Sequence, residues 1–260
     1  MPVVIHPSKK DSLGDRMKAR YEDRWRFMLP VRTYTIIRAD GRAFHTWTKK
    51  LERPYDTRFM TWMDHAAEAL VKEISGARFA FVQSDEISVL IVDFENIDTE
   101  PWFDGIVQKI ASVSASIATA AFNSAVQNYV GSTLPPATFD SRVFIIPDPV
   151  EVENYFIWRQ KDAERNSVTM LAQKYFSHKQ LEGKNTTERQ ELIHQAEDDW
   201  AKHPVGFKRG RVVRRLSLTK DEGERSHVAV DSNTPVFTRD RSYLQSLIPR
   251  IWKEKEGEDD

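Results

Sequence analysis

Residues 78–93, which read RFAFVQSDEISVLIVD, decide the fold of this chain. Two runs rich in β-branched and aromatic residues, at 78–83 and 87–93, are separated only by the polar segment SDE at 84–86. Runs of this composition joined by a short polar segment predict two antiparallel strands and a tight turn. The sequence therefore predicts a β-hairpin that carries a pair of carboxylates at its tip.

The segments on either side of this hairpin extend the pattern. We expect strands at 31–38 and 141–146 and helices at 56–75 and 102–129. Asp56 stands at the N-cap position of the first of these helices, and Gly76 follows its last turn. The order strand, helix, hairpin, helix, strand is the split βαβ arrangement of ferredoxin-like and palm domains. We therefore predict an α+β fold built on a ferredoxin-like palm domain, an antiparallel sheet with helices on one face.

The chain changes character after residue 149. Further helices are expected at 12–28, 150–175 and 188–202, and a basic strand, KRGRVVRRLSLTK, at 208–220. The charged residues from Lys253 onwards are expected to form a frayed tail. We therefore divide the chain into a palm-like catalytic domain at 1–149 and a helical and basic β extension at 150–260, packed on the palm.

Composition excludes several classes of protein. The 260 residues are 40% hydrophobic and contain no cysteine, so disulfides and thiolate metal sites are excluded. We find no apolar run of about 18 residues and no signal-peptide pattern, and we expect a cytoplasmic protein without a membrane partner. The net charge is −1, so any nucleic acid must be bound by a local basic patch.

Two aspartates are the strongest candidates for chemistry. Asp40 ends the first strand and Asp85 lies at the hairpin tip, so a palm topology would bring their side chains together. Two Mg²⁺ ions held by carboxylates suit phosphoryl and nucleotidyl transfer, and Gly41 would add a carbonyl ligand. The main-chain amides of residues 41–45 could hold a triphosphate. An Asp-Gly turn and an acidic hairpin tip are also common as solvated turns, and the residues alone leave both interpretations open.

Four motifs carry a resemblance to a known family. They are RADGRAFHTWT at 38–48, QSDEIS at 83–88, WRQKD at 158–162 and SHKQLEGKNTTE at 177–188. The chain resembles the tRNA(His) guanylyltransferase superfamily over about four fifths of its length, and the similarity fades after Val213. The resemblance implies a palm-like enzyme that adds nucleotides to the 5′ end of tRNA, with two Mg²⁺ ions and with ATP, GTP and other nucleoside triphosphates as substrates. It also implies a homotetramer.

The resemblance also implies roles for individual residues. Asp40, Asp85 and the carbonyl of Gly41 would bind metal, and Glu86 would support catalysis in the same acidic motif. The residues implied to bind the nucleotide are Arg38, Gly41, Arg42, Ala43, Phe44, His45, Arg53 and Ser84.

The extension carries the candidates for RNA contact. They are Arg159, Lys161, Arg165, Asn166, Lys179, Lys184, Lys208, Arg209 and Arg211. Basic side chains of this kind can bind RNA phosphates, which supply affinity rather than sequence choice. The alternative for each is a solvated surface position. We expect the extension to contribute to RNA binding and to assembly.

One departure from the family pattern bears on the substrate. Eukaryotic guanylyltransferases carry His-Ile-Asn-Asn where this chain reads ERNS at 164–167. This is similar to the bacterial and archaeal branch, which is associated with template-directed repair of 5′-truncated tRNAs. The alternatives are a tRNA(His)-specific guanylyltransferase that adds a single G, a nucleotidyl cyclase, and a non-catalytic RNA-binding module.

Overall fold

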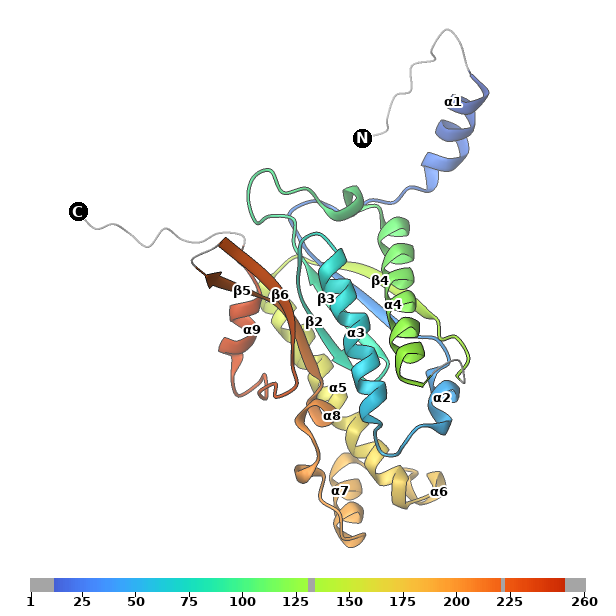
Figure 1. Ribbon diagram of the computed structural model, residues 1–260, viewed down its shortest axis with the longest axis vertical. Coiled ribbons are helices and arrows are strands. Elements are labelled where there is room, and N and C mark those ends of the chain that lie inside the picture. The colour runs from blue at the N-terminus through green and yellow to red at the C-terminus, as the bar shows by residue number, and fades with distance from the viewer. Residues whose placement is uncertain (1–11, 131–133, 221–222, 251–260) are drawn as a thin grey trace, which may run out of the picture.

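One antiparallel sheet organises the protein. The computed structural model describes residues 12–130, 134–220 and 223–250 (Figure 1). The strands are β1 (Tyr34–Gly41), β2 (Ala77–Gln83), β3 (Glu86–Ile91), β4 (Phe139–Ile146), β5 (Arg211–Lys220) and β6 (Gly223–Asp231). They pair in the order β4-β1-β3-β2-β5-β6, each antiparallel to its neighbour. The basic strand of the extension therefore continues the sheet of the first half of the chain.

Helices cover both faces of this sheet. The helices are α1 (Leu13–Met17), α2 (Phe44–Trp47), α3 (Thr57–Glu73), α4 (Val107–Val130), α5 (Pro149–Tyr175), α6 (His178–Leu181), α7 (Thr186–Gln195), α8 (Val205–Arg209) and α9 (Arg241–Leu247). Figure 1 shows α3 and α4 side by side on one face, as expected for the first half of the chain, and α5 on the opposite face. No helix among the described residues is long and apolar enough to cross a membrane.

The two faces follow from the alternation of side chains along each strand. In β1, Ile37 and Ala39 point into a core shared with α3 and α4, whereas Tyr34 and Ile36 point into a core shared with α5 and α9. Both sets are completely buried. Two-sided burial explains why β2 and β3 are almost continuously apolar rather than alternating.

Capping residues set the start of the long helices. The side chain of Asp56 accepts hydrogen bonds from the main-chain N–H groups of Arg58 and Phe59, which confirms it as the N-cap of α3. Asp148 caps α5 in the same way. Asn185 and Glu188 form a capping box at the start of α7.

Three predicted elements differ from the structure. α7 ends at Gln195, well before residue 202, because Glu197 adopts a positive φ of 61° that a helix cannot continue. The basic segment begins as helix α8, and Gly210, with φ of 79°, separates it from β5. The predicted helix at 12–28 is a five-residue α-helix followed by π and 3₁₀ turns that end at Trp25. The charged tail from Lys253 lies outside the described residues.

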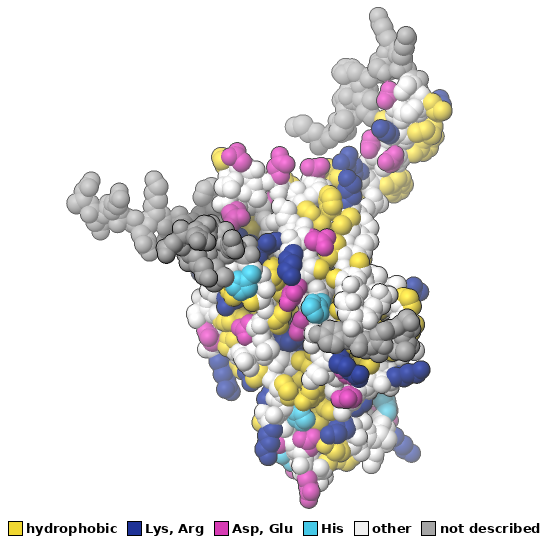
Figure 2. Space-filling model, in the orientation of Figure 1, with side chains coloured by type: hydrophobic (Ala, Val, Ile, Leu, Met, Phe, Trp, Pro, Cys, Tyr) yellow, Lys and Arg dark blue, Asp and Glu magenta, His cyan; other side chains and the backbone are white. Residues whose placement is uncertain are grey.

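The N-terminal helical segment, residues 13–25, makes few contacts with the rest of the molecule. It projects from the body in Figure 1, and Figure 2 shows hydrophobic side chains gathered on it. Leu13, Tyr21 and Trp25 are each more than 60% exposed. An apolar surface of this kind on a short helix marks a surface for association rather than a stable solvated end.

Candidate active site

The two candidate aspartates lie at the same end of neighbouring strands. β1 and β3 pair with Asp40 directly opposite Glu86, and the main-chain N–H of Gly41 donates to the carbonyl of Asp85 at 2.9 Å. Asp85 is half-buried, and its burial raises the pKa of its carboxyl, with the nearby charge of Asp40 acting in the same direction. Arg142 on β4 approaches Asp40 with its Nη2 atom at 3.6 Å. The sheet thus brings together the carboxylates that the sequence indicated.

Glu86 has a different environment from the two aspartates. It is buried, and Nη2 of Arg159 on α5 donates to its Oε2 at 2.8 Å while Nε of Arg159 lies 2.7 Å from its Oε1. Arg38 is a second cation at 3.9 Å. Burial raises the pKa of Glu86, and the charges of Arg159 and Arg38 oppose this rise. Glu86 is therefore held by arginines inside the fold, whereas Asp40 and Asp85 stand at its edge.

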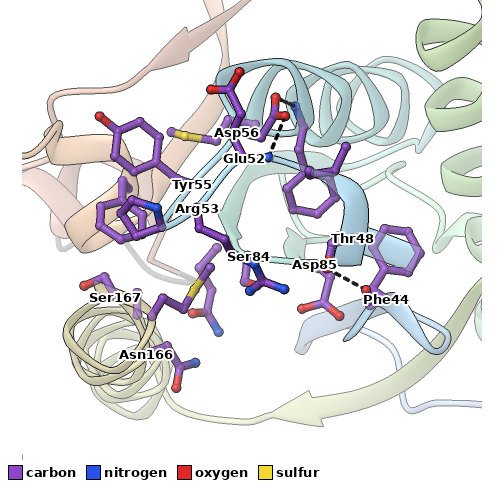
Figure 3. A pocket seen from close by; sticks show the side chains of 18 of the residues that line it. Phe44, Thr48, Glu52, Arg53, Tyr55, Asp56, Ser84, Asp85, Asn166 and Ser167 are labelled. Atoms are coloured by element: carbon purple, nitrogen blue, oxygen red, sulfur yellow. Dashed lines mark hydrogen bonds between the residues drawn. The ribbon is translucent and has the colours of Figure 1, made fainter. Parts of the chain in front are cut away.

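A cavity of about 250 Å³ opens beside Asp85 (Figure 3). One wall comes from α2 and the loop to α3, including His45 and Arg53, and another from Ser84 at the hairpin tip. Asn166 and Ser167 of α5 lie across the cavity from Asp85, as Figure 3 shows. The cavity is thus bounded on one side by the carboxylate edge and on the other by α5.

Several cavity residues were missed by the sequence interpretation, and three of them offer groups suited to a ligand. The rings of Tyr55 and Phe207 pack at 4.7 Å between centroids and form an aromatic wall. Gln83 also lines the cavity, is 5% exposed, and has a side-chain oxygen, Oε1, that is buried without a hydrogen-bond partner. A buried acceptor left unsatisfied next to a cavity is suited to a donor on a ligand. The local sequences around Tyr55 and Gln83, LERPYD at 51–56 and QSDEIS at 83–88, do not single out these side chains, and Phe207 lies outside both.

The expected nucleotide residues fall into three groups. Phe44, His45, Arg53 and Ser84 line the cavity, and Phe44 is also buried among aromatic rings, whereas Arg42 and Ala43 are exposed and do not line it. The other two serve the structure around the cavity: Arg38 faces Glu86, and Gly41 touches Phe44.

Main-chain hydrogen bonds reduce the number of amides in residues 41–45 that could bind a triphosphate. A Cβ at Gly41 would lie 2.4 Å from the Phe44 ring, so this position requires glycine. The N–H groups of Gly41 and Arg42 already donate to the carbonyls of Asp85 and Thr138. Of the amides of residues 41–45, only those of residues 43–45 remain as candidates for phosphate contact.

Three of the predicted RNA-binding residues are buried, so the structure does not place them at an RNA surface. Arg159 pairs with Glu86, and Arg211 pairs with Asp64 at 2.6 Å between Nε and Oδ1. Nζ of Lys208 donates to the carbonyl of Ala201. Their charges are satisfied within the fold, which is why a burial of 95% or more is tolerated.

The remaining RNA candidates stay accessible. Lys161, Arg165 and Lys179 are exposed, and Lys184 and Arg209 are half-buried. Asn166 is exposed towards the cavity beside Asp85, so its position favours nucleotide rather than RNA backbone. Lys161, Arg165 and Arg209 line a second cavity on the other side of α5.

The donor atoms at the carboxylate edge suit a hard cation. Among the described residues, no group of three or more His, Cys, Asp or Glu side chains is placed to hold a metal ion. A cation at Asp40 and Asp85 would need further oxygens from the main chain or from a substrate. Mg²⁺ commonly binds in this way, with one or two carboxylates plus phosphates and water.

A pair of strand-end carboxylates beside a cavity, on an α+β sheet, is the arrangement of enzymes that transfer nucleotidyl groups. Comparison with known proteins makes this class specific. The family model for tRNAHis guanylyltransferase matches residues 14–147, and the chain belongs to this family of nucleotidyltransferases.

Individual relatives extend the match beyond that region. A solved bacterial tRNA(His) guanylyltransferase-like protein in complex with ATP is 40% identical, with a TM-score of 0.83 over 92% of this chain and 99% of that one. A protein of Acanthamoeba polyphaga mimivirus is 30% identical over 92% of this chain and 88% of its own length. The probable tRNA(His) guanylyltransferase of Dictyostelium discoideum is 32% identical over 52% of each.

Proposed function

We propose that this protein adds nucleotides in the 3′-to-5′ direction to the 5′ end of tRNA, directed by the opposite strand of the acceptor stem. The observation that carries the proposal is Asp85 in the wall of a cavity, with Asp40 close enough to act on its charge, in a family of nucleotidyltransferases. The split βαβ order of β1 to β4 supports a palm-like catalytic domain at 1–149, with the extension at 150–260 packed on it.

The proposed reaction has two steps. The 5′-monophosphate of the RNA attacks the α-phosphate of ATP, which releases pyrophosphate and leaves an adenylylated 5′ end. The 3′-hydroxyl of an incoming nucleoside triphosphate then attacks the RNA 5′ phosphate, and AMP leaves. An RNA with a 5′-triphosphate would skip the first step and lose pyrophosphate in the second. The nucleotide chain thus grows by one residue at its 5′ end.

Different residues around the cavity would bind the base and the phosphates of a nucleotide. Tyr55 and Phe207 provide an aromatic wall on which a base can pack, and Gln83 offers a free acceptor for a base N–H group. Arg53 and His45 line the same cavity and are the basic side chains that suit the phosphates. Nucleotide binding in the family is consistent with these roles, since structures of a bacterial tRNA(His) guanylyltransferase-like protein were solved in complex with ATP and with GTP.

Asp40, Asp85 and the carbonyl of Gly41 would hold the Mg²⁺ ions. All three offer the hard oxygen donors that Mg²⁺ prefers, and Asp85 carries a raised pKa that a bound cation would lower again. The metal would neutralise charge that develops on the phosphates. Glu86 would not bind the metal, and would instead support the site by holding Arg159 and Arg38 in place.

Repair of truncated tRNAs is favoured over addition of a single G to tRNA(His). The segment ERNS at 164–167 replaces the eukaryotic His-Ile-Asn-Asn, and its Asn166 and Ser167 form part of the cavity wall. The 40% identity to a bacterial tRNA(His) guanylyltransferase-like protein points in the same direction. The tRNA(His)-specific activity is the second candidate, because the curated relatives include enzymes with that name.

The test uses tRNAs of several identities that lack their first 5′ nucleotide, with a label at the 5′-phosphate, ATP, all four nucleoside triphosphates and Mg²⁺. We expect addition of the nucleotide complementary to the opposite strand on every tRNA. Addition to tRNA(His) alone, or of G regardless of the opposite base, would overturn the repair function. Cyclic nucleotide without RNA extension would instead identify a cyclase.

A matched pair of variants tests the site. We expect Asp85→Asn to abolish extension while tRNA binding is kept, because it removes a metal ligand and no phosphate contact. Asp98→Asn, at an exposed loop carboxylate outside the site, is the control and should extend normally. Unchanged activity of Asp85→Asn would show that extension does not depend on this site. If the wild type binds tRNA but does not extend it, the protein is a non-catalytic RNA-binding module.

We also propose that the protein assembles as a homotetramer. The exposed apolar residues of the N-terminal helical segment support association of copies, because this surface is uncovered in the single chain. Molar mass in solution, measured by light scattering, tests the assembly directly.

A further inference from the structure

A second cavity lies on the far side of α5 from the nucleotide cavity. Its volume is about 610 Å³, and its walls come from α5, α7, α8 and the segment that precedes α9. We call it the basic groove, because four of the side chains that line it are Lys161, Arg165, Arg209 and Arg239, against the single carboxylate of Glu164. The sequence interpretation had not selected Arg239.

The charges of the groove are left largely uncompensated. Arg165 pairs with Asp162 at 2.6 Å, but Lys161, Arg209 and Arg239 form no ion pair with any described residue. The same three cations lie close enough to Glu164 to oppose the rise in its pKa that burial causes. Three cations around a single half-buried carboxylate leave the groove with a net positive charge that a further anion would compensate.

Helix geometry places the groove and the nucleotide cavity back to back. Ala163, Asn166 and Met170 of α5 line the nucleotide cavity, whereas Lys161, Arg165 and Val168 line the groove. At 3.6 residues per turn these two sets lie on opposite sides of one helix, whose diameter with side chains is about 10–12 Å. A strand whose 5′ end lies at the carboxylate edge could therefore cross α5 and reach the groove within a few nucleotides.

We propose that the basic groove binds the phosphodiester backbone of the RNA substrate a few nucleotides from the reacting 5′ end. The groove, at about 610 Å³, is larger than a single small anion needs and is lined by four cations, which suits successive phosphates. Thr186, Gln190 and Thr238 add neutral donors of the kind that contact phosphate and 2′-hydroxyl groups. This inference rests on the proposed function for the identity of the RNA.

The experiment compares Arg239→Gln and Arg209→Gln with Arg78→Gln. Arg78 lies at the start of β2, the end of that strand remote from the active site, and pairs with Glu95 at 3.0 Å. Binding of labelled tRNA is measured over a series of salt concentrations. We expect each groove variant to bind several-fold more weakly and to reduce the slope of log K against log salt by about 1, with no change of slope for Arg78→Gln.

A second readout separates this site from the catalytic site. At saturating tRNA, the groove variants should extend the RNA with the same kcat as the wild type, and only the KM for tRNA should rise. Binding of ATP and of inorganic pyrophosphate, measured by titration calorimetry without RNA, should be unchanged. Thermal unfolding of each variant should match the wild type, since Arg239 is exposed and Arg209 has no ion pair to lose among the described residues.

The outcomes distinguish failure of the groove proposal from failure of the proposed function. If the wild type extends tRNA and both groove variants keep its salt slope, the groove proposal is wrong and the proposed function stands. If the variants weaken pyrophosphate or ATP binding but not the tRNA slope, the groove is a site for a free phosphate compound and not for RNA. If the wild type neither binds nor extends tRNA, the proposed function fails and the groove proposal fails with it.

Discussion

Arg159→Met should destabilise the protein far more than the loss of a surface charge. The side chain of Arg159 is 5% exposed and that of Glu86 is 11% exposed, and two of their nitrogen–oxygen distances are 2.7 and 2.8 Å. Removing the guanidinium leaves the carboxylate of Glu86 buried, with Arg38 at 3.9 Å as its remaining cation. Breaking a buried pair from one side costs about 3–5 kcal/mol, because the other charge is left uncompensated.

The size of this effect can be separated from lost packing by a double-mutant cycle. Glu86→Gln should cost less than Arg159→Met, because Arg159 keeps Asp162 as a partner at 3.0 Å. The double variant removes both charges and should cost less than the sum of the single effects, by about 1–3 kcal/mol. The free energy of unfolding is measured by urea denaturation, with circular dichroism and tryptophan fluorescence as independent probes.

Arg165→Met is the control for this cycle. Its guanidinium also binds Asp162, at 2.6 Å, but its side chain is 56% exposed. An exposed pair contributes about 0–1 kcal/mol, so this variant should unfold close to the wild type. If the effects of Arg159→Met and Glu86→Gln add within about 0.5 kcal/mol, the two side chains are not coupled and the reasoning from burial is refuted.

Three further predictions concern other parts of the molecule. The pKa of Asp198 is lowered to about 2, first by the Tyr175 hydroxyl; it therefore stabilises the fold above its ordinary value of 3.8, and this stability is lost as the pH falls towards 2. Asp198→Asn should remove about 1–2 kcal/mol of that acid dependence in urea unfolding followed from neutral to acid pH. Gly210→Ala should cost at least about 2 kcal/mol in the same assay, because φ is 79° and a Cβ would lie 2.4 Å from the Phe81 ring; an effect below about 0.5 kcal/mol would contradict this. Trp25→Ser should lower the molar mass in solution if the N-terminal helical segment joins the copies, and an unchanged mass would exclude that role for Trp25.

Local sequence patterns were sufficient to predict much of the fold. The hairpin follows from two β-forming runs around a short polar turn, and the start of α3 follows from Asp56, because both signals act between residues close in the chain. The end of α7 could not be predicted, since Glu197 at positive φ has no distinctive residue type. Coverage of the second sheet face by α5 depends on tertiary packing.

The candidate site was likewise only partly predictable from the sequence. Asp40 and Asp85 could be brought together from the order of the strands alone. The burial of Arg211 could not be predicted, because its partner Asp64 is 147 residues away in the chain and a basic run indicates only charge. The aromatic wall of Tyr55 and Phe207 joins two segments that share no local pattern.

The three acidic residues of the site are distinguished by what surrounds them rather than by their order in the chain. Glu86 is satisfied by Arg159 inside the fold, so its charge is already balanced. Asp40 has only Arg142 among the described cations, at 3.6 Å on a side chain that is 56% exposed, and the pKa of Asp85 is raised by burial and by Asp40. A bound cation would compensate both of these carboxylates. A metal site at this edge would therefore be paired with a structural ion pair beneath it, which explains why three adjacent acids can coexist at the end of two strands.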